Sequence, residues 1–326
     1  MDREEIRAMI AQWSGSRAVP EKFQILTDTT DFFRVEYNDV LLLDDTPYWV
    51  KRCEKEGRFG LDDEPKHWVR RAIALTDGTT RILKLVFHEE FETRIGSVVV
   101  KCFRSPKKEA RILKLVADHP NFMHGHAVND LAGNNVRIIE YIPGRRLDEM
   151  VADHAADHHA YFHQAFPAFL DQFIEMTKAI KFLHDHGEKH GDIRRDHILW
   201  DRERHIHRWI DFDYNYQHGE AMFGFDLQGL GNILIFLAGG GDILTADLYH
   251  EQRGLFDSLW GEDLNISYKN RVANLRKIFP YIPESLNRIL LHFSFGAKIF
   301  YDTTEQMLDD LAQARADVAT ITGRGI

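Results

Sequence analysis

The stretch from 190 to 214, HGDIRRDHILWDRERHIHRWIDFDY, constrains the fold of this chain more than any other. Two apolar runs within 198–210 flank the polar turn at 201–204, and this pattern predicts a β-hairpin. A hairpin brings the residues before and after it close together, so Asp211 would return to the side of Asp192. The sequence therefore predicts two carboxylates in one cleft.

Two neighbouring carboxylates suit phosphoryl transfer, in which one orients the attacking hydroxyl and the other holds the metal that neutralises the nucleotide phosphates. The segment resembles the catalytic and metal-binding core of the protein kinase-like superfamily. Residues 190–192 (HGD) look like its His-x-Asp catalytic loop, and residues 210–212 (IDF) look like its metal-holding Asp-Phe motif. The resemblance implies Asp192 as the catalytic base and Asp211 as a Mg²⁺ ligand.

His197 departs from this resemblance, because the superfamily has a metal-binding Asn at that position. Mg²⁺ prefers oxygen ligands and binds imidazole poorly, whereas Mn²⁺ tolerates mixed nitrogen and oxygen ligation. Asp196, the preceding residue, would supply an oxygen ligand instead. We therefore expect ATP with Mg²⁺ or Mn²⁺ as cofactors, and Asp211, His197 and Asp196 as candidate metal ligands.

Composition narrows the class of protein. A chain of 326 residues that is 44% hydrophobic and 28% charged is long and apolar enough for two globular lobes. A net charge of −10 argues against nucleic-acid partners and against anionic membranes, since both need basic patches. With only Cys53 and Cys102 and no signal-peptide core or apolar span, we expect a cytoplasmic protein without a disulfide framework.

The apolar pattern changes along the chain. Residues 1–31 begin with a short amphipathic helix and are expected to form an N-terminal helical extension. Short alternating runs from 32 to 103 predict an antiparallel sheet, with the Asp77–Gly78 turn joining two of its strands. We expect an α+β fold, and the resemblance implies a bilobal kinase-like one. Its N-terminal lobe, 32–143, would be an antiparallel sheet with one main helix, and its C-terminal lobe, 144–326, mainly helical.

Lys84 and Glu109 are each expected on an apolar face. Lys84 alternates with apolar residues in a strand, and Glu109 shares a face with Ile112 on a helix that Ser105 and Pro106 would open. A carboxylate on such a face needs a cationic partner. The pair resembles the superfamily's strand lysine and helix glutamate, in which the lysine contacts the nucleotide phosphates. A snorkelling lysine and a solvated glutamate are the alternative.

Lys101 competes with Lys84 for this role, but it lies too close to Glu109 in the sequence to leave room for a strand, a turn and a helix entry. Lys84 is therefore preferred. Gly57 and Gly60, in EKEGRFG, are candidates for a loop over the phosphates, because glycine lets backbone N–H groups approach closely. An ordinary charged turn explains them about as well.

Residues 135–144, NVRIIEYIPG, read as a strand that stops at Pro-Gly. By resemblance this is the hinge between lobes, and Glu140, Tyr141 and Ile142 would line the adenine site. A strand leading into a plain turn is the alternative. Farther on, Asp226 resembles the aspartate that opens a helix and braces the catalytic loop, although a simple N-cap would look the same in sequence.

The resemblance leaves the acceptor class open. The connection from Asp211 to Asp226 is short and lacks an Ala-Pro-Glu motif, which looks like aminoglycoside and choline phosphotransferases that act on small-molecule hydroxyls. The helix start DLQGLG looks more like a protein kinase. We expect an ATP-dependent kinase acting on a hydroxyl, most simply of a small molecule. The alternatives are a serine/threonine-type protein kinase and a pseudokinase that uses the nucleotide cleft as a switch or scaffold, as His197 would allow.

Overall fold

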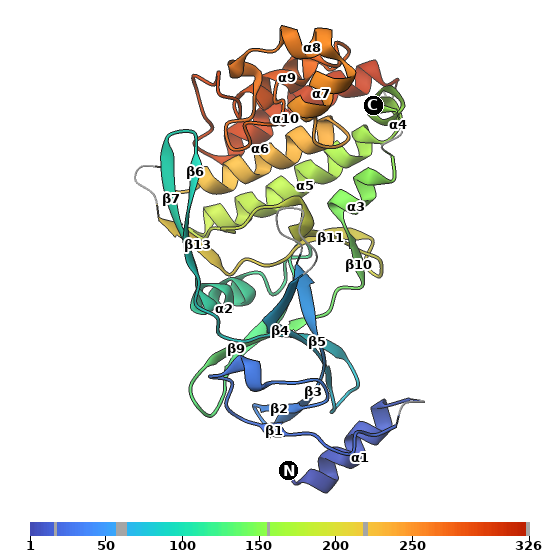
Figure 1. The fold of residues 1–326 in the computed structure, drawn as a ribbon, viewed down its shortest axis with the longest axis vertical. Coiled ribbons are helices and arrows are strands. Elements are labelled where there is room, and N and C mark those ends of the chain that lie inside the picture. Colours follow the sequence, from blue (N-terminus) through green and yellow to red (C-terminus); the bar gives the residue numbers. More distant parts are fainter. Residues whose placement is uncertain (16–17, 57–63, 155–156, 218–220, 324–326) are drawn as a thin grey trace. The chain divides into compact units, whose positions relative to one another are not determined.

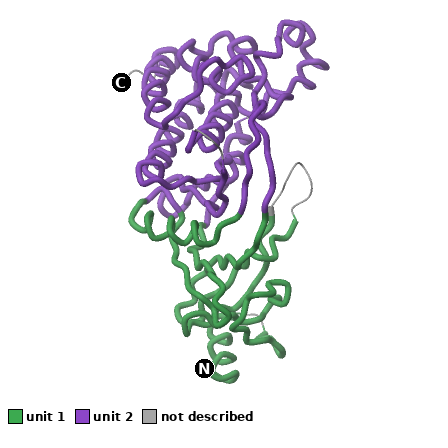
Figure 2. Tube along the Cα trace, turned by 90° about the vertical axis from the view of Figure 1, so that its left-hand side faces the viewer, with its two compact units in different colours: residues 1–89, 104–119, 123–142 green, residues 90–103, 120–122, 143–326 purple. Residues whose placement is uncertain are grey.

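The computed structural model describes residues 1–15, 18–56, 64–154, 157–217 and 221–323. In these residues, helices α1 to α10 accompany sheets that are antiparallel in most of their pairings, so the predicted α+β class is confirmed. The chain divides into two compact units (Figure 2). Unit 1 comprises Met1–Glu89, Arg104–His119 and Met123–Ile142, and unit 2 comprises Glu90–Phe103, Pro120–Phe122 and Pro143–Ile326.

Unit 1 is built on a seven-stranded sheet. Its neighbours are antiparallel except for one parallel pair, β1 with β2, and its buried face carries a core of aliphatic side chains. The strands in order across the sheet are β1 (Ile25–Leu26), β2 (Val40–Leu43), β3 (Thr46–Glu56), β4 (Glu64–Ala74), β5 (Thr80–Lys84), β9 (Asn135–Glu140) and β8 (Gly125–Asn129).

The N-terminal helix α1 (Arg3–Trp13) is part of unit 1. Its Trp13 ring lies against Gly78, which has φ +74° in the β4–β5 turn, and a Cβ there would come within 2.4 Å of the ring. The Trp13 indole also donates to the Leu75 carbonyl at 2.9 Å. Glycine is therefore required in this turn both for its backbone conformation and for the approach of the tryptophan.

One sheet assignment from the sequence was wrong. Residues 98–103 do form a strand, but β7 (Val98–Arg104) pairs with β6 (Glu90–Ile95) and β13 (Tyr214–Gln217) in a separate three-stranded sheet. The local pattern predicts a strand and contains no information about a partner that lies more than a hundred residues later. Helix α2 (Pro106–Leu115) follows as expected, and the Ser105 side chain accepts from the Lys108 amide at its first turn.

Unit 2 has a core of long helices, in which α5 (Phe166–Asp185) packs against α6 (Gly224–Ala238) and α10 (Thr304–Ile321), and α9 (Glu284–Leu291) packs against α6 and α10 (Figure 1). Helix α5 ends at Asp185, and Gly187 follows in the left-handed conformation at φ +72°, which is typical of a helix C-terminus. The shorter helices of unit 2 are α3 (Leu147–Ala152), α4 (His158–Gln164), α7 (Thr245–Glu251) and α8 (Arg253–Ser258). The described residues also form short 3-10 helices. In unit 1 this is η1 (Phe32–Arg34), and in unit 2 these are η2 (Arg195–His197), η3 (Gly261–Asp263) and η4 (Leu275–Lys277).

The hairpin predicted within 198–210 is present. Strands β11 (Ile198–Asp201) and β12 (Ile206–Trp209) are antiparallel, and β10 (Gly144–Arg146) adds a third strand beside β11. Trp209 is fully buried and donates its indole N–H to the Met176 carbonyl at 3.0 Å, which fixes the end of β12 on α5. None of the described helices is both long and apolar enough to cross a membrane.

Candidate functional site

The expected ion pair between Lys84 and Glu109 is present in unit 1. Lys84 Nζ at the end of β5 lies 2.8 Å from Glu109 Oε1 on α2, and both residues are buried. The other carboxylate oxygen, Oε2, accepts from Nε of Arg137 at 3.0 Å. Sequence reasoning missed Arg137, although its position between apolar residues of β9 was a usable signal. The result is a buried cluster of one carboxylate held by two cations.

The side chains of the expected hinge, Glu140, Tyr141 and Ile142, contact other residues of unit 1 or are buried. Glu140 accepts from the His124 backbone amide at 2.8 Å, and the Arg71 guanidinium lies 4.0 Å above the centre of the Tyr141 ring. Ile142 is buried, with 6% of its surface exposed. Gly57 and Gly60 lie outside the residues that the structure describes.

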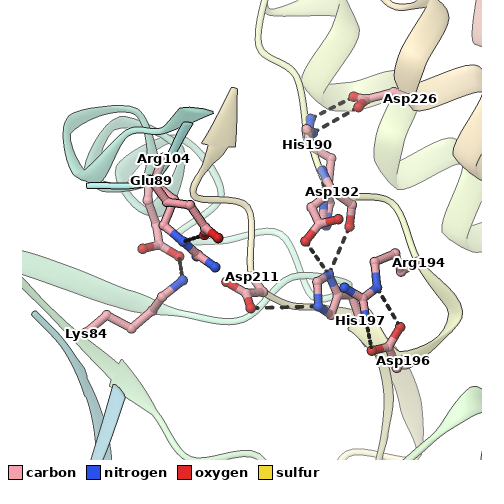
Figure 3. Close-up of polar contacts among 12 residues, drawn as sticks. Lys84, Glu89, Arg104, His190, Asp192, Arg194, Asp196, His197, Asp211 and Asp226 are labelled. Carbon is pink, nitrogen blue, oxygen red and sulfur yellow. Dashed lines mark hydrogen bonds and ion pairs between the residues drawn. The ribbon is translucent and has the colours of Figure 1, made fainter. Parts of the chain in front are cut away.

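The catalytic-loop candidate in unit 2 is held by its backbone (Figure 3). The buried Asp226 carboxylate accepts from the amides of His190 at 2.7 Å and Gly191 at 2.9 Å, and His184 Nε2 lies 3.1 Å away. Gly191 has φ +87°, a conformation that favours glycine. Because the N-cap of α6 is Phe223, Asp226 braces the loop and does not merely cap the helix.

Asp192 and Asp211 both lie at the imidazole of His197 (Figure 3). His197 Nδ1 is 2.9 Å from the Asp192 carbonyl oxygen and 3.5 Å from its carboxylate, whereas Nε2 is 3.7 Å from Asp211 Oδ2. The histidine is buried, while 18% of the Asp192 side chain and 14% of the Asp211 side chain are exposed. The hairpin therefore does bring the two predicted carboxylates to one place.

Asp211 has an unusual backbone conformation, with φ +63°. Aspartate tolerates this left-handed region better than most residues with a side chain, and such conformations persist where the surroundings impose them. Here the neighbours on both sides are fixed, because Trp209 is anchored on α5 and Phe212 is fully buried with its ring edge-on to Phe122. The strained turn directs Asp211 towards His197.

Asp196 has a different partner. Arg194 donates to both of its carboxylate oxygens, at 3.0 and 2.5 Å. Burial disfavours the charged carboxylate, but the neighbouring His197 and Arg194 outweigh it and hold the pKa of Asp196 below its ordinary value. An oxygen occupied by a guanidinium is a poor metal ligand, so the geometry favours Asp211 and His197 over Asp196.

The donor set at His197 fits a bound metal. The carbonyl of Asp192 can only accept, so Nδ1 carries a hydrogen, and loss of the proton from Nε2 on metal binding would leave that nitrogen's lone pair on the side of Asp211. Metal-binding histidines are oriented by this kind of hydrogen bond at their other nitrogen. In the described part of the chain no three His, Cys, Asp or Glu side chains form a preassembled metal site. Water and phosphate oxygens would have to complete the coordination.

Lys101, the competing lysine candidate, and His158, a half-buried histidine outside the site, both have clear structural positions. Lys101 is exposed on β7, whereas Lys84 holds Glu109, so the lysine preference agrees with the ion pair. The two ring nitrogens of His158 lie 2.7 Å from the Tyr281 hydroxyl and 2.9 Å from the Ala238 carbonyl oxygen. His158 is therefore engaged in holding α4 to its neighbours.

Two comparisons with known proteins bear on the family of this chain. A scan against models of protein families found none that matches the chain. A search of the curated proteins found no similar sequence either.

Proposed function

We propose that this protein is an ATP-dependent phosphotransferase with a bilobal protein kinase-like fold, which moves the γ-phosphate of ATP to a hydroxyl acceptor. The observation that carries the proposal is the convergence of Asp192 and Asp211 on His197, in a loop whose backbone is braced by Asp226. One carboxylate is then available for the acceptor hydroxyl and the other for a metal.

Each residue has a role in this proposal. Asp192 orients the acceptor hydroxyl and takes its proton, and Asp211 with Nε2 of His197 holds Mg²⁺ or Mn²⁺. The metal supplies charge neutralisation of the phosphates. Lys84, positioned by Glu109, contacts the phosphates. The backbone of 140–142 would meet the adenine.

A small-molecule acceptor is favoured over a peptide. Soon after Asp211 the chain enters strand β13 (Tyr214–Gln217), which belongs to the same sheet as β7. A protein kinase needs a long segment in this region to form its peptide-docking platform. The short connection leaves little chain for one.

Metal-dependent nucleotide binding is the first test. Thermal stability should rise with ATP plus Mn²⁺ or Mg²⁺ in the wild type, and this rise should disappear in Asp211→Asn. Asparagine is the suitable replacement because it also tolerates the left-handed φ of +63°, so loss of binding would not come from added backbone strain. No stabilisation of the wild type at millimolar nucleotide would contradict the proposal.

Transfer is the second test. ATP consumption is measured over a panel of hydroxyl metabolites and peptides, and Asp192→Asn should lower the acceptor-dependent rate by about 100-fold or more. Its affinity for ATP should stay unchanged, because a group that only orients the acceptor contributes little to nucleotide binding. Wild-type transfer in Asp192→Asn would exclude this residue as the base.

A further inference from the structure

Two arginines of unit 2 share one carboxylate near the candidate catalytic loop. Arg195 Nη1 lies 2.9 Å from Asp242 Oδ2, and Arg271 Nη1 lies 3.2 Å from Asp242 Oδ1. Two guanidiniums carry ten N–H donors, whereas one carboxylate accepts about four hydrogen bonds. Asp242 therefore cannot use the donor capacity of both arginines. It neutralises only one of the two positive charges.

Aromatic rings support both guanidiniums. Arg195 lies 4.1 Å above the centre of the Phe236 ring on α6, and Arg271 lies 4.1 Å above that of Tyr268. A stacked guanidinium stays planar and keeps its edge available for carboxylate or phosphate. The Arg195 and Arg271 side chains are 30% and 26% exposed, so a ligand from solvent can reach them.

The cluster is tied to the catalytic loop through Arg195. This residue opens η2 (Arg195–His197), and the hydrogen bond between His197 Nδ1 and the Asp192 carbonyl closes the short loop that contains it. Asp192 and Arg195 are thus parts of one closed loop. The backbone of Arg271 is held in a separate turn, in which its amide donates to the Tyr268 carbonyl at 2.9 Å.

We propose that Arg195 and Arg271 bind an anionic group, carboxylate or phosphate, of the molecule whose hydroxyl is phosphorylated. This inference rests on the proposed function, because it names the acceptor class of the same site. Bidentate guanidinium contacts to such anions are strong and directional. A cationic acceptor, such as an aminoglycoside or choline, would meet two arginines and be repelled. The cluster carries a formal charge of +1, although the net charge of the chain is −10.

The test uses sugars that differ in one substituent. Binding of glucose, glucuronate, glucose 6-phosphate and glucosamine to the ATP-analogue complex is measured by ligand-observed NMR. At least one of the two acidic sugars should bind about tenfold or more tightly than glucose, equivalent to about 1.4 kcal/mol, and glucosamine should bind most weakly. The two acidic sugars distinguish a carboxylate from a phosphate as the preferred group.

Three variants separate anion binding from a structural role. Arg271→Gln should abolish the preference for the acidic sugar. Asp242→Asn should increase it several-fold, because it removes the competing carboxylate and keeps both guanidiniums. Arg253→Gln is the matched control, since Arg253 also pairs with an aspartate, Asp257 at 2.9 Å, and stacks on Tyr249 at 4.3 Å. The affinity of all three for the ATP analogue should match that of the wild type.

Equal binding of acidic and neutral sugars by the wild type would overturn the inference, as would a preference that survives Arg271→Gln. If Arg271→Gln does not fold, Asp242→Asn decides: weaker or unchanged binding of the acidic sugar would assign the cluster to structure alone. Failure of the wild type to bind the ATP analogue at all would instead reject the proposed function.

Discussion

The charged cluster of unit 1 and the braced loop of unit 2 are built in opposite ways. In unit 1, Lys84, Glu109 and Arg137 are all at most 4% exposed, and they hold one another by side-chain contacts. In unit 2, Asp192 and Asp211 stay partly exposed and are positioned mainly through backbone hydrogen bonds and a left-handed residue.

The difference in burial between the two groups of charges suits them to different roles. A buried cation held by a carboxylate is fixed in place, since moving it would leave charges without partners in a medium of low dielectric constant. Under the proposed function it would serve as a binding element. A carboxylate at the surface of a rigid loop can exchange water for a metal or a substrate at little cost. The comparison predicts that unit 1 variants change stability most, and that loop variants change chemistry more than stability.

Arg137→Met is expected to give the largest loss of stability. It removes one of the two cations on Glu109, and breaking a buried charge cluster in this way costs about 3–5 kcal/mol of the unfolding free energy. Arg276→Met is the matched control, because Arg276 also pairs with a glutamate, Glu284 at 3.5 Å, but with 46% and 72% of the side chains exposed. That pair should contribute about 1 kcal/mol or less. Equal losses in urea unfolding would show that burial does not distinguish the two.

Acid should weaken unit 2 through His207. Burial lowers the pKa of His207 on β12 from 6.5 to about 4. Below pH 6.5 the unfolded chain therefore takes up a proton that the folded imidazole resists, so the unfolding free energy falls as the pH drops. The loss through this group is complete near pH 4 and amounts to about 3 kcal/mol.

His207→Phe removes this titration and keeps a ring in a buried position near Trp200. Unfolding free energies of the wild type and the variant are compared at pH 7 and pH 4.5, where the wild type should lose more than the variant. Parallel pH profiles would show that another buried group controls acid stability.

Asp226→Asn tests the brace of the loop. The amide keeps one acceptor oxygen but presents an NH₂ group to a backbone N–H, so about 2 kcal/mol of stability should be lost together with transfer activity. Asp157→Asn is the control, because Asp157 also accepts from two backbone amides, at the exposed N-terminus of α4, where asparagine caps as well as aspartate. If the two variants lose the same unfolding free energy, the burial of Asp226 does not add to the stability of the loop.

The site could be predicted from the sequence wherever local pattern determined it. The hairpin, the Asp77–Gly78 turn and the start of α2 follow from periodicity, turn residues and capping. The burial of Lys84 and Glu109 followed from charged residues at apolar positions, which always need a partner.

What could not be predicted depends on contacts between distant segments. The second cation on Glu109, Arg137, comes from a strand whose place in the sheet is set by β5 and β8 on either side. The sheet of β6, β7 and β13 and the arginine pair at Asp242 likewise join segments that are far apart in sequence. A single sequence gives the tendency of each segment but not its neighbours.

His197→Asn should produce the smallest change, in the metal preference of the loop. In the wild type Nε2 faces Asp211, and in the proposed metal site it would offer nitrogen to the metal, which suits Mn²⁺ better than Mg²⁺. Asparagine can donate its N–H to the Asp192 carbonyl and present oxygen towards Asp211. The preference for Mn²⁺ over Mg²⁺ should then fall by about tenfold, near 1.4 kcal/mol, measured as stabilisation by ATP with each metal.

Asp196→Asn is the control for this metal effect. Arg194 holds both oxygens of Asp196, so this substitution should leave the metal preference unchanged. If Asp196→Asn changes the preference and His197→Asn does not, the oxygen ligand is Asp196 and Arg194 must release it on metal binding. The histidine would then only pack and close the loop. If the predicted pattern is found instead, the loop of unit 2 binds its metal through a nitrogen that its own backbone orients.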